Sequence, residues 1–362
     1  MRYGLSQCFV MKWSRSMDQD LSLDARGWKK GKGRCYSRRD EERILRIHRE
    51  LDADPLEHFS GASAILQRYQ KLYPKAKRVS LRFIGRTLAK HGLSSKPKVR
   101  RKGVSRYLHY PEATINNLGK SLLEIDFIGK KFITGRTKPV NFIAFSLRFP
   151  RKLKHFQRIE SETGDEAIKQ CLRFFQRFER PQVVKLDNGL AFAGSSPWPR
   201  VLGGLVLFLL SKKVVPVFTA PRKPWNQASI EGANSIFSRK FWHRFEFKTL
   251  SQIDEHLVYF NRSYQRYTGY EKPKRLEPRM KRFVPKVYFI RKVYEHPKTK
   301  RGYIDILKER VLLPKSYINM FVLAEWNLNS EQLTVCYENK LKTEIIKKLP
   351  FALNPVTKQK VY

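Results

Sequence analysis

The chain has 362 residues, 41% of them hydrophobic and 13% aromatic, which is enough to fold as two or three domains with real cores. Its formal net charge of +42 favours a polyanionic partner, with nucleic acid preferred over an anionic membrane surface. No apolar run approaches the ~18 residues of a membrane span, and the opening residues lack the apolar region of a secretory signal. We therefore expect a nucleoid-associated protein of the cytoplasm, or a nuclear protein in a eukaryote, without membrane contact.

The four cysteines, Cys8, Cys35, Cys171 and Cys336, form no C-x-x-C pair and have no histidine at zinc spacing. They are expected to be reduced and structural, so no zinc module is predicted at the N-terminus. Residues 1–36 show no clean periodicity and include the run GWKKGKGR. This composition is typical of a flexible, basic, phosphate-seeking segment.

Three helices are predicted in residues 37–95. The first begins at Ser37 and ends before Pro55, the second covers residues 60–73, and Ser80 caps the third. Such a unit is consistent with a helix-turn-helix DNA-binding domain, whose last helix lies in the major groove. An ordinary three-helix bundle with a solvated basic face gives the same pattern.

In the third helix, one side is expected to be buried and the other to face outward. The buried candidates are Leu81, Ile84 and Leu88, and the outward candidates for DNA contact are Arg82, Arg86 and Lys90.

Residues 96–120 are predicted to be a basic linker. The stretch KPKVRRKGVSR has six basic residues and no acid, and its candidate phosphate contacts are Lys98, Arg100, Arg101 and Lys102. Two interpretations are equally open: a solvated linker, or an extended segment that follows phosphates or enters a minor groove.

Residues 121–269 alternate strands with helices. Three strands (within 121–129, 131–149 and 154–159) precede a helix over 163–178, a strand over Val183–Leu186, a helix over 201–210, a strand over 214–219 and two final helices. The first of these two helices follows Pro224 and Asn226, which are plausible start signals, and the second begins at Thr249. The order predicts an α/β domain with a mixed sheet.

Three carboxylates stand at points where this domain can bring them together. Asp126 lies near the end of the strand in SLLEIDFIG, and Asp187 ends Val183–Leu186 just before an Asn188-Gly189 turn. Glu231 lies on a basic helix, beside the apolar stripe of Ile230, Ala233, Phe237 and Phe241. Taken alone, Glu231 reads as an ordinary solvated charge.

The motifs that surround these carboxylates resemble those of one enzyme superfamily. They are Asp126, Asp187-Asn188-Gly189, Pro224-Trp225-Asn226, Ile230-Glu231-Gly232 and Asn234. Their order resembles the catalytic core of the DDE transposases and retroviral-type integrases, which have a ribonuclease-H-like fold. The forty-three residues between Asp187 and Glu231 exceed the usual family spacing, so we expect a loop insertion near residues 194–204.

The resemblance implies a DNA transposase or integrase, with metal-dependent cleavage at mobile-element ends and transfer of the 3′-OH into target DNA. It implies two Mg²⁺ ions, replaceable by Mn²⁺, with Asp126 bridging both and Asp187 and Glu231 each holding one. Oxygen ligands suit such hard cations. The implied partner is double-stranded DNA, both element ends and target, bound by a homo-multimer.

Other residues near the site have two interpretations. Glu124 shares a strand face with Asp126 and is an alternative ligand, although its position along the strand is about 6.6 Å away. Asn234, Ser235 and Ser238 follow Glu231 along the helix and either contact the DNA end or are plain polar surface residues. We take Asn234 and Ser238 as candidate DNA contacts.

After a basic linker over 270–285, short β-rich runs over 286–349 predict a small all-β domain, which the resemblance implies is an SH3-like barrel, followed by a tail over 350–362. Two other functions remain open. One is a domesticated or regulatory DNA-binding protein with an inactive core. The other, a ribonuclease H or structure-specific nuclease, is disfavoured because it needs no helix-turn-helix.

Overall fold

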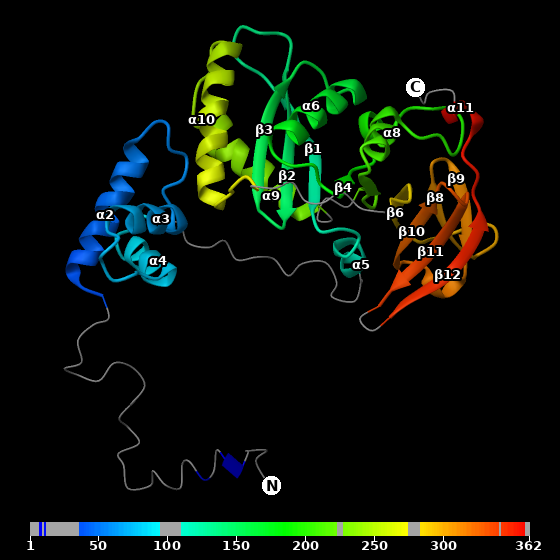
Figure 1. Cartoon of the computed structure of the whole chain (residues 1–362), viewed down its shortest axis with the longest axis horizontal. Helices are drawn as coiled ribbons and strands as arrows, with labels where there is room; N and C mark the ends of the chain where they lie inside the picture. Colours follow the sequence, from blue (N-terminus) through cyan, green and yellow to red (C-terminus); the bar gives the residue numbers. More distant parts are fainter. Residues whose placement is uncertain are drawn as a thin grey trace.

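The computed structural model describes residues 7–8, 11, 36–94, 110–222, 227–273, 283–339 and 342–358. Three helices lie at one end, a mixed α/β core lies in the centre, and the C-terminal strands lie at the other end (Figure 1). The predicted flexible segment falls almost wholly outside the described residues, as does the basic run over 96–106. No helix in the described ranges is long and apolar enough to cross a membrane.

The N-terminal unit consists of α2 (Arg38–Ala53), α3 (Ala62–Leu72) and α4 (Leu81–Lys90). Ser37 and Asp40 form a capping box at the start of α2, and the Ser80 side chain accepts the N–H of Phe83 at the start of α4. The small core of the unit includes Ile44, Ile47, Ile65, Tyr69, Ile84 and Leu88. The predicted burial of Leu81 is wrong, because this first residue of α4 precedes the packed turns and is 48% exposed.

The loop between α2 and α3 joins this unit to the core. The N–H of His58 donates to Ser263 Oγ at 3.2 Å, and the ring of Phe59 stacks on Tyr267 with centroids 4.4 Å apart. Both partners lie on α10 (Leu250–Thr268), beside which the unit stands in Figure 1.

The core sheet begins with an antiparallel meander of β1 (Leu122–Lys131), β2 (Val140–Phe149) and β3 (Leu153–Ile159). β4 (Val183–Leu186) pairs with β1 in parallel, and β5 (Val215–Phe218) pairs with β4 in parallel. The strand order of this part is therefore β3-β2-β1-β4-β5. Both the mixed sheet and the sequential order of its elements confirm the prediction for this domain.

Helices cover the two faces of the core sheet. α6 (Gly164–Arg177) and α8 (Gly204–Ser211) pack on the face that Leu123 and Ile125 enter, next to the short α7 (Leu190–Ala193). α9 (Ala228–Phe237) and α10 pack on the opposite face, where they bury Ile128 and Phe142. Consecutive residues of β1 point to opposite faces, so Glu124 and Asp126 lie on the α9 side.

α9 buries Ile230, Ala233 and Phe237 of the predicted stripe and leaves Glu231 exposed, and Phe241 is buried just beyond the end of α9. Its last turn runs into a π-helix, η2 (Ser238–Trp242), so the helix continues farther than α9 alone. The predicted start signals Pro224 and Asn226 lie outside the described residues. The capping box of Thr249 and Gln252 at the start of α10 is confirmed.

The C-terminal strands extend the core sheet. β6 (Lys286–Lys292) pairs with β5 in parallel, opposing Val217 to Tyr288 and Phe218 to Phe289. β10 (Phe321–Asn327), β11 (Gln332–Glu338) and β12 (Thr343–Pro350) continue it, so one sheet runs through nine strands from β12 to β3. β7 (Tyr294–Glu295), β8 (Gly302–Ile306) and β9 (Glu309–Leu313) form a second, three-stranded sheet.

Two further segments attach the C-terminal strands to the core. α5 (Glu112–Asn116), which precedes β1, is held by Glu338 of β11, whose carboxylate accepts the N–H of Thr114 at 2.8 Å. The predicted loop insertion packs on the C-terminal unit, where the Arg200 N–H donates to the carbonyl of Leu307 at 2.9 Å. Its extra length therefore forms a docking surface.

The residues predicted as a tail are partly packed. Phe351 is buried, and its carbonyl accepts a hydrogen bond from Trp326 Nε1 at 2.7 Å. The short α11 (Pro355–Lys358) follows, and its buried Thr357 accepts the N–H of Leu202 from the insertion at 3.4 Å. These contacts join residues that are far apart in the sequence, so sequence periodicity cannot predict them.

Candidate active site

Three carboxylates line one cavity of about 350 Å³ at the C-terminal end of β4. They are the predicted Asp126, Asp187 and Glu231, and they come from β1, from the residue after β4 and from the first turn of α9. The remaining wall includes Asn188, Gly189, Thr219, Ala220, Pro221, Arg222 and Gln227. The cavity thus gathers the acidic residues that the sequence singled out.

The pairing of β1 with β4 explains why the two aspartates meet. Glu124 lies opposite Lys185 in that parallel ladder. Continuing the register by two residues sets Asp126 opposite Asp187, one residue beyond the end of β4. Neighbouring strands are about 4.8 Å apart, so the two carboxylates are held close by the sheet itself.

The turn after Asp187 is shaped by its own side chain. Asp187 Oδ1 accepts the N–H of Gly189 at 2.9 Å. A Cβ atom at Gly189 would lie 3.0 Å from that oxygen, closer than side-chain carbons normally approach, which accounts for the glycine. Asn188 Nδ2 donates to the carbonyl of Thr219 at 2.6 Å and fixes the turn against the end of β5.

Asn234, predicted as a DNA contact, has a partner inside the protein. Its Nδ2 donates to Asp126 Oδ2 at 2.9 Å, because one helical turn places it above β1. Its Oδ1 is buried and has no hydrogen-bond partner among the described residues, and the same holds for Gln227 Nε2. Ser238 lies farther along, half-buried at the start of η2.

The electrostatics of the cavity favour a positively charged ligand. Burial raises the pKa of Asp126 to about 7, and repulsion from Asp187 and Glu231 adds to this effect, while the hydrogen bond from Asn234 opposes it. Burial also raises the pKa of Asp187. Ionisation of Asp126 is therefore unfavourable in this cavity, and a cation bound there would favour its charged form.

The donor set suits a hard divalent cation in chemistry, because every candidate ligand is a carboxylate or amide oxygen. Within the described ranges, however, no three His, Cys, Asp or Glu side chains are already arranged to hold a metal ion. The three carboxylates share one cavity, and they are the residues that would hold a divalent cation there.

Glu124, the alternative ligand, lies outside the lining of the cavity. It is 1% exposed and is enclosed by Arg148 Nη1 at 3.5 Å and Lys185 Nζ at 3.8 Å. Its Oε2 accepts the backbone N–H of Ile230 at 3.0 Å. Burial raises the pKa of Glu124, although Lys185 and Arg148 act in the opposite direction. Its contacts are those of a structural carboxylate.

A residue that sequence analysis missed reaches the cavity wall from the C-terminal unit. Arg291 of β6 donates from Nη1 to the carbonyl of Thr219 at 3.1 Å and from Nε to the carbonyl of Asp305 at 2.9 Å. The Thr219 carbonyl thus receives both Arg291 and Asn188. Burial lowers the pKa of Arg291 to about 10, against the effect of Asp305. An arginine inside the apolar run VYFIRKVY was the available signal.

The predicted DNA contacts in the helical unit remain predictions. Arg82 and Arg86 are exposed on α4, whereas Lys90 pairs with Glu41 of α2 at 3.1 Å. The candidates Lys98, Arg100, Arg101 and Lys102 lie outside the described residues, as do Pro224, Trp225 and Asn226.

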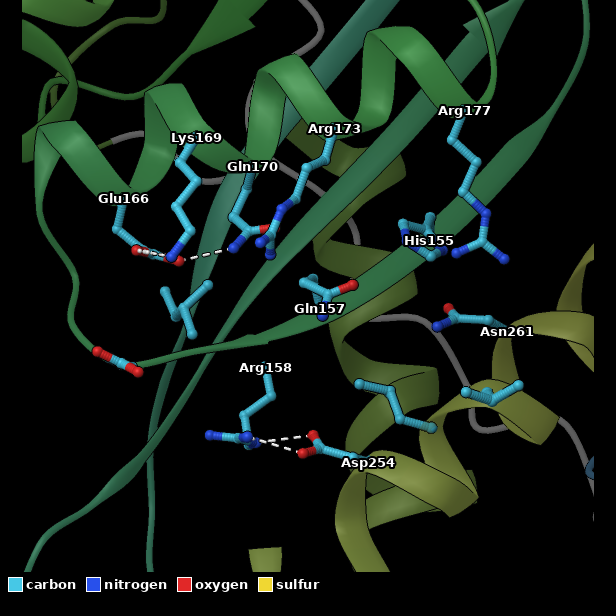
Figure 2. A pocket seen from close by; sticks show the side chains of 14 residues that line it. His155, Gln157, Arg158, Glu166, Lys169, Gln170, Arg173, Arg177, Asp254 and Asn261 are labelled. Atoms are coloured by element: carbon cyan, nitrogen blue, oxygen red, sulfur yellow. Dashed lines mark hydrogen bonds and ion pairs between the residues drawn. The ribbon is translucent and has the colours of Figure 1, made fainter. Parts of the chain in front are cut away.

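A second cavity of about 380 Å³ lies between α6, β3 and α10, apart from the three carboxylates (Figure 2). Arg158 makes two hydrogen bonds of 2.7 Å to Asp254, and Lys169 pairs with Glu166 at 3.4 Å. The buried Asn261 binds the N–H and carbonyl of Phe156, each at 2.9 Å, and so covers part of the free edge of β3. Four of the charged residues that line this cavity are therefore paired with one another.

No protein-family model matches this sequence, and the comparison with curated proteins finds no match. Solved structures do match, among them the BIV integrase catalytic core (17% identity, TM-score 0.29, 39% of this chain and 82% of that one). A simian T-cell lymphotropic virus intasome in complex with PP2A regulatory subunit B56 gamma matches at 13% identity and TM-score 0.36, over 82% of this chain and 96% of that one. The HTLV-2 integrase core in complex with magnesium matches at 16% identity and TM-score 0.30, over 39% and 86%.

These matches are to retroviral integrases, the group that the sequence motifs resemble. The strand order β3-β2-β1-β4-β5, with helices on both faces of the sheet, agrees with the ribonuclease-H-like fold that the sequence motifs imply.

Proposed function

We propose that the protein is a DDE-type DNA transposase or integrase, which cleaves DNA at the ends of a mobile element and joins the 3′-OH to target DNA. One observation supports this most directly: Asp126, Asp187 and Glu231 line a single cavity on a mixed β3-β2-β1-β4-β5 sheet. Three acids distant in sequence share that cavity because of strand register and helix placement.

Asp126, Asp187 and Glu231 would hold the divalent cations, Mg²⁺ or Mn²⁺, that this activity needs. When bound, two such ions stabilise the attacking and leaving oxygens of a phosphodiester. The protein's own contribution is to orient the carboxylates. Asn234 Nδ2 fixes one oxygen of Asp126, and the Gly189 N–H fixes one oxygen of Asp187.

DNA binding is proposed to use the parts outside the cavity. The net charge of +42 supports a polyanionic partner, and the exposed Arg82 and Arg86 on α4 support a helix-turn-helix whose last helix enters the major groove. We further propose that the C-terminal strands act as the small SH3-like barrel of an integrase, and that the protein works as a homo-multimer on element ends and target DNA.

A second candidate function is that of a DNA-binding regulator with an inactive core. The observations that favour it are the net charge of +42 and the exposed Arg82 and Arg86, which support DNA binding without requiring cleavage. The two functions differ in whether DNA is cut, so one experiment separates them.

The test uses the full-length protein, Mg²⁺ and labelled duplexes from the DNA that flanks the gene, with inverted repeats as candidate ends. Asp126→Asn, Asp187→Asn and Glu231→Gln should each reduce cleavage to background and leave duplex binding nearly unchanged. Asp165→Asn, at an exposed position in the first turn of α6, is the matched control and should cut like the parent. Binding without cleavage by the parent would support the regulator instead.

A further inference from the structure

A third hollow, of about 410 Å³, lies just beyond the C-terminal end of β1. The loop after β1 forms one wall, and the chain that follows η2 forms the other. Four aromatic side chains line it: Phe132, Trp242, Phe245 and Phe247. We call it the aromatic hollow.

The two walls of the aromatic hollow differ in how firmly they are packed. Trp242 and Phe247 belong to the hydrophobic core under α9 and α10, and their ring centroids lie 5.6 Å apart. Phe132, in contrast, is 61% exposed. Single exposed apolar residues are ordinary. Phe132 differs from such single residues, because it lies beside three other aromatic side chains that line the same hollow. We therefore interpret the aromatic hollow as a binding surface.

Cations are frequent in the chain on both sides of Phe132, Ile133 and Thr134, which line the aromatic hollow. Lys130 and Lys131 end β1, and Arg136 and Lys138 lie in the connection to β2. Residues 130–139 contain no acid, and none of these four cations forms an ion pair with a described carboxylate. Lys248 also lines the hollow, with Glu246 as the one acid among its lining residues. Aromatic faces bordered by unpaired cations suit a ligand with flat rings and phosphates, which is an unpaired stretch of nucleic acid.

The aromatic hollow and the carboxylate cavity share two elements. Asp126 and Phe132 are separated by six residues of nearly continuous strand, which is about 20 Å. Glu231 and Trp242 are separated by eleven residues of continuous helix, which is about 16 Å. At the ~3.4 Å per nucleotide of a B-form strand, these lengths correspond to about five or six nucleotides between the two sites.

We propose that the aromatic hollow stacks an unpaired base of the DNA whose phosphates reach the carboxylate cavity. Phe132 supplies the exposed ring, Trp242 the ring packed against the core, and the cations between Lys130 and Lys138 bind the adjoining phosphates. The proposal rests on the proposed function only in taking DNA as the partner. It makes no use of cleavage.

The test compares two DNAs on the full-length protein: a blunt duplex, and the same duplex with a short single-stranded overhang that carries the fluorescent base 2-aminopurine. The parent should bind the overhang DNA more tightly and quench its fluorescence. Phe132→Ala should weaken overhang binding by roughly 5- to 150-fold, the range of one stacked base, and abolish the quenching. Its affinity for the blunt duplex should stay at the parent value.

Further variants distinguish ring stacking from plain apolar contact and from charge attraction. Phe132→Tyr should retain overhang binding, whereas Phe132→Leu should lose it, because leucine is apolar but has no ring. Trp198→Ala removes a ring that is 58% exposed on the insertion loop and should bind both DNAs like the parent. Arg136→Ala should weaken overhang binding but leave the fluorescence quenching of the bound DNA intact, because it removes a phosphate contact and no ring.

The proposal is overturned if Phe132→Leu binds like the parent, or if Phe132→Ala weakens both DNAs equally or neither. It is also overturned if Phe132→Ala changes only the oligomeric state or only the binding of anionic lipid vesicles, since the occupant would then be a protein or a membrane. Absence of binding to either DNA by the parent would overturn the proposed function itself.

Discussion

The carboxylate of Glu124 accepts the backbone N–H of Ile230 at 3.0 Å, and Ile230 directly precedes Glu231. The first N–H groups of a helix have no partner inside the helix, so Glu124 acts as a remote cap for α9 and complements its dipole. Lys154 Nζ holds the same turn through the Ser229 carbonyl at 3.1 Å. The position of Glu231 therefore depends on a carboxylate that does not line the cavity.

Substituting Glu124 should reduce stability more than it alters DNA binding. Glu124→Ala leaves Lys185 and Arg148 without their shared buried partner, so we expect the free energy of unfolding to fall by about 3–5 kcal/mol. Glu124→Gln keeps an acceptor for the Ile230 N–H and should lose less. Urea unfolding measures both values.

Cleavage assays on the same proteins check the strand register. Glu124→Gln should retain partial Mg²⁺-dependent cleavage while Asp126→Asn shows none. If the order were reversed, Glu124 would be the ligand and the assignment of Asp126 would be wrong.

Arg291 should matter for cleavage although it belongs to a C-terminal strand. Arg291→Ala removes hydrogen bonds to the carbonyls of Thr219 and Asp305, which should cost about 2–3 kcal/mol of stability and loosen the turn that Asn188 holds. Arg291→Lys should not restore cleavage, because a single ammonium nitrogen cannot reach both carbonyls that separate guanidinium nitrogens bind. Rates are compared at a temperature where all variants are folded.

Arg310→Ala is the control for this experiment. Arg310 is exposed and pairs with the side chain of Asp305 at 3.1 Å, so its loss should affect neither stability nor cleavage appreciably. Full cleavage by Arg291→Ala would show that the cavity wall does not need the C-terminal unit.

His155 should make the protein sensitive to acid. Burial lowers the pKa of His155 to about 3, and Arg177 adds to this, whereas an unfolded histidine titrates near its ordinary value of ~6.5. Between these values the unfolded state binds more protons, so stability is present above pH ~6.5 and falls as the pH falls, by up to about 1.4 kcal/mol per unit.

His155→Phe removes the titrating group from its aromatic surroundings of Phe145, Phe174 and Phe178. Urea unfolding between pH 7.5 and pH 4.5 should show a shallower loss for this variant than for the parent. His243→Phe, at an exposed position, should follow the parent. Equal slopes for His155→Phe and the parent would contradict the prediction.

Arg82 and Arg86 should govern which sequence is bound. If α4 lies in the major groove, Arg82→Ala or Arg86→Ala should cost about 1–3 kcal/mol on the specific end and little on unrelated duplex. Arg49→Ala, at an exposed position on α2 and not on α4, is the control. Competition binding of end and scrambled duplexes measures the difference. If both arginine variants still prefer the end duplex over the scrambled duplex as strongly as the parent does, another part of the chain recognises the sequence.

Local patterns in the sequence predicted most of the core and the cavity. The 3.6-residue stripe of α9 identified its buried side and left Glu231 beside it, and the capping residues Ser37, Ser80 and Thr249 marked where helices begin. The alternation in β1 put Asp126 and Glu124 on one face but could not decide between them. The register with β4 and the contact of Glu124 with α9 place Asp126 in the cavity and Glu124 outside its lining.

Contacts between distant segments could not be predicted in this way. The pairing of β5 with β6 joins residues some seventy positions apart, and the sequence of neither strand indicates which strand it pairs with. β12, at the edge of the sheet, shows mostly exposed or half-exposed residues and so lacks the apolar run that marks a strand. The loop over 194–204 was recognised as extra length, while its role in docking depends on Leu307 and Thr357.

The place of β6 in the sheet affects the order in which a newly made chain can complete its cavity. Asp126, Asp187 and Glu231 all leave the ribosome before Arg291, and at ~5–20 residues per second the interval between Thr219 and Arg291 lasts on the order of several seconds. During that interval β5 has one open edge, and the Thr219 carbonyl lacks its arginine. A translation product interrupted before β6 would therefore carry all three acids in a cavity whose wall lacks Arg291, so the cavity is finished only after β6 has been made.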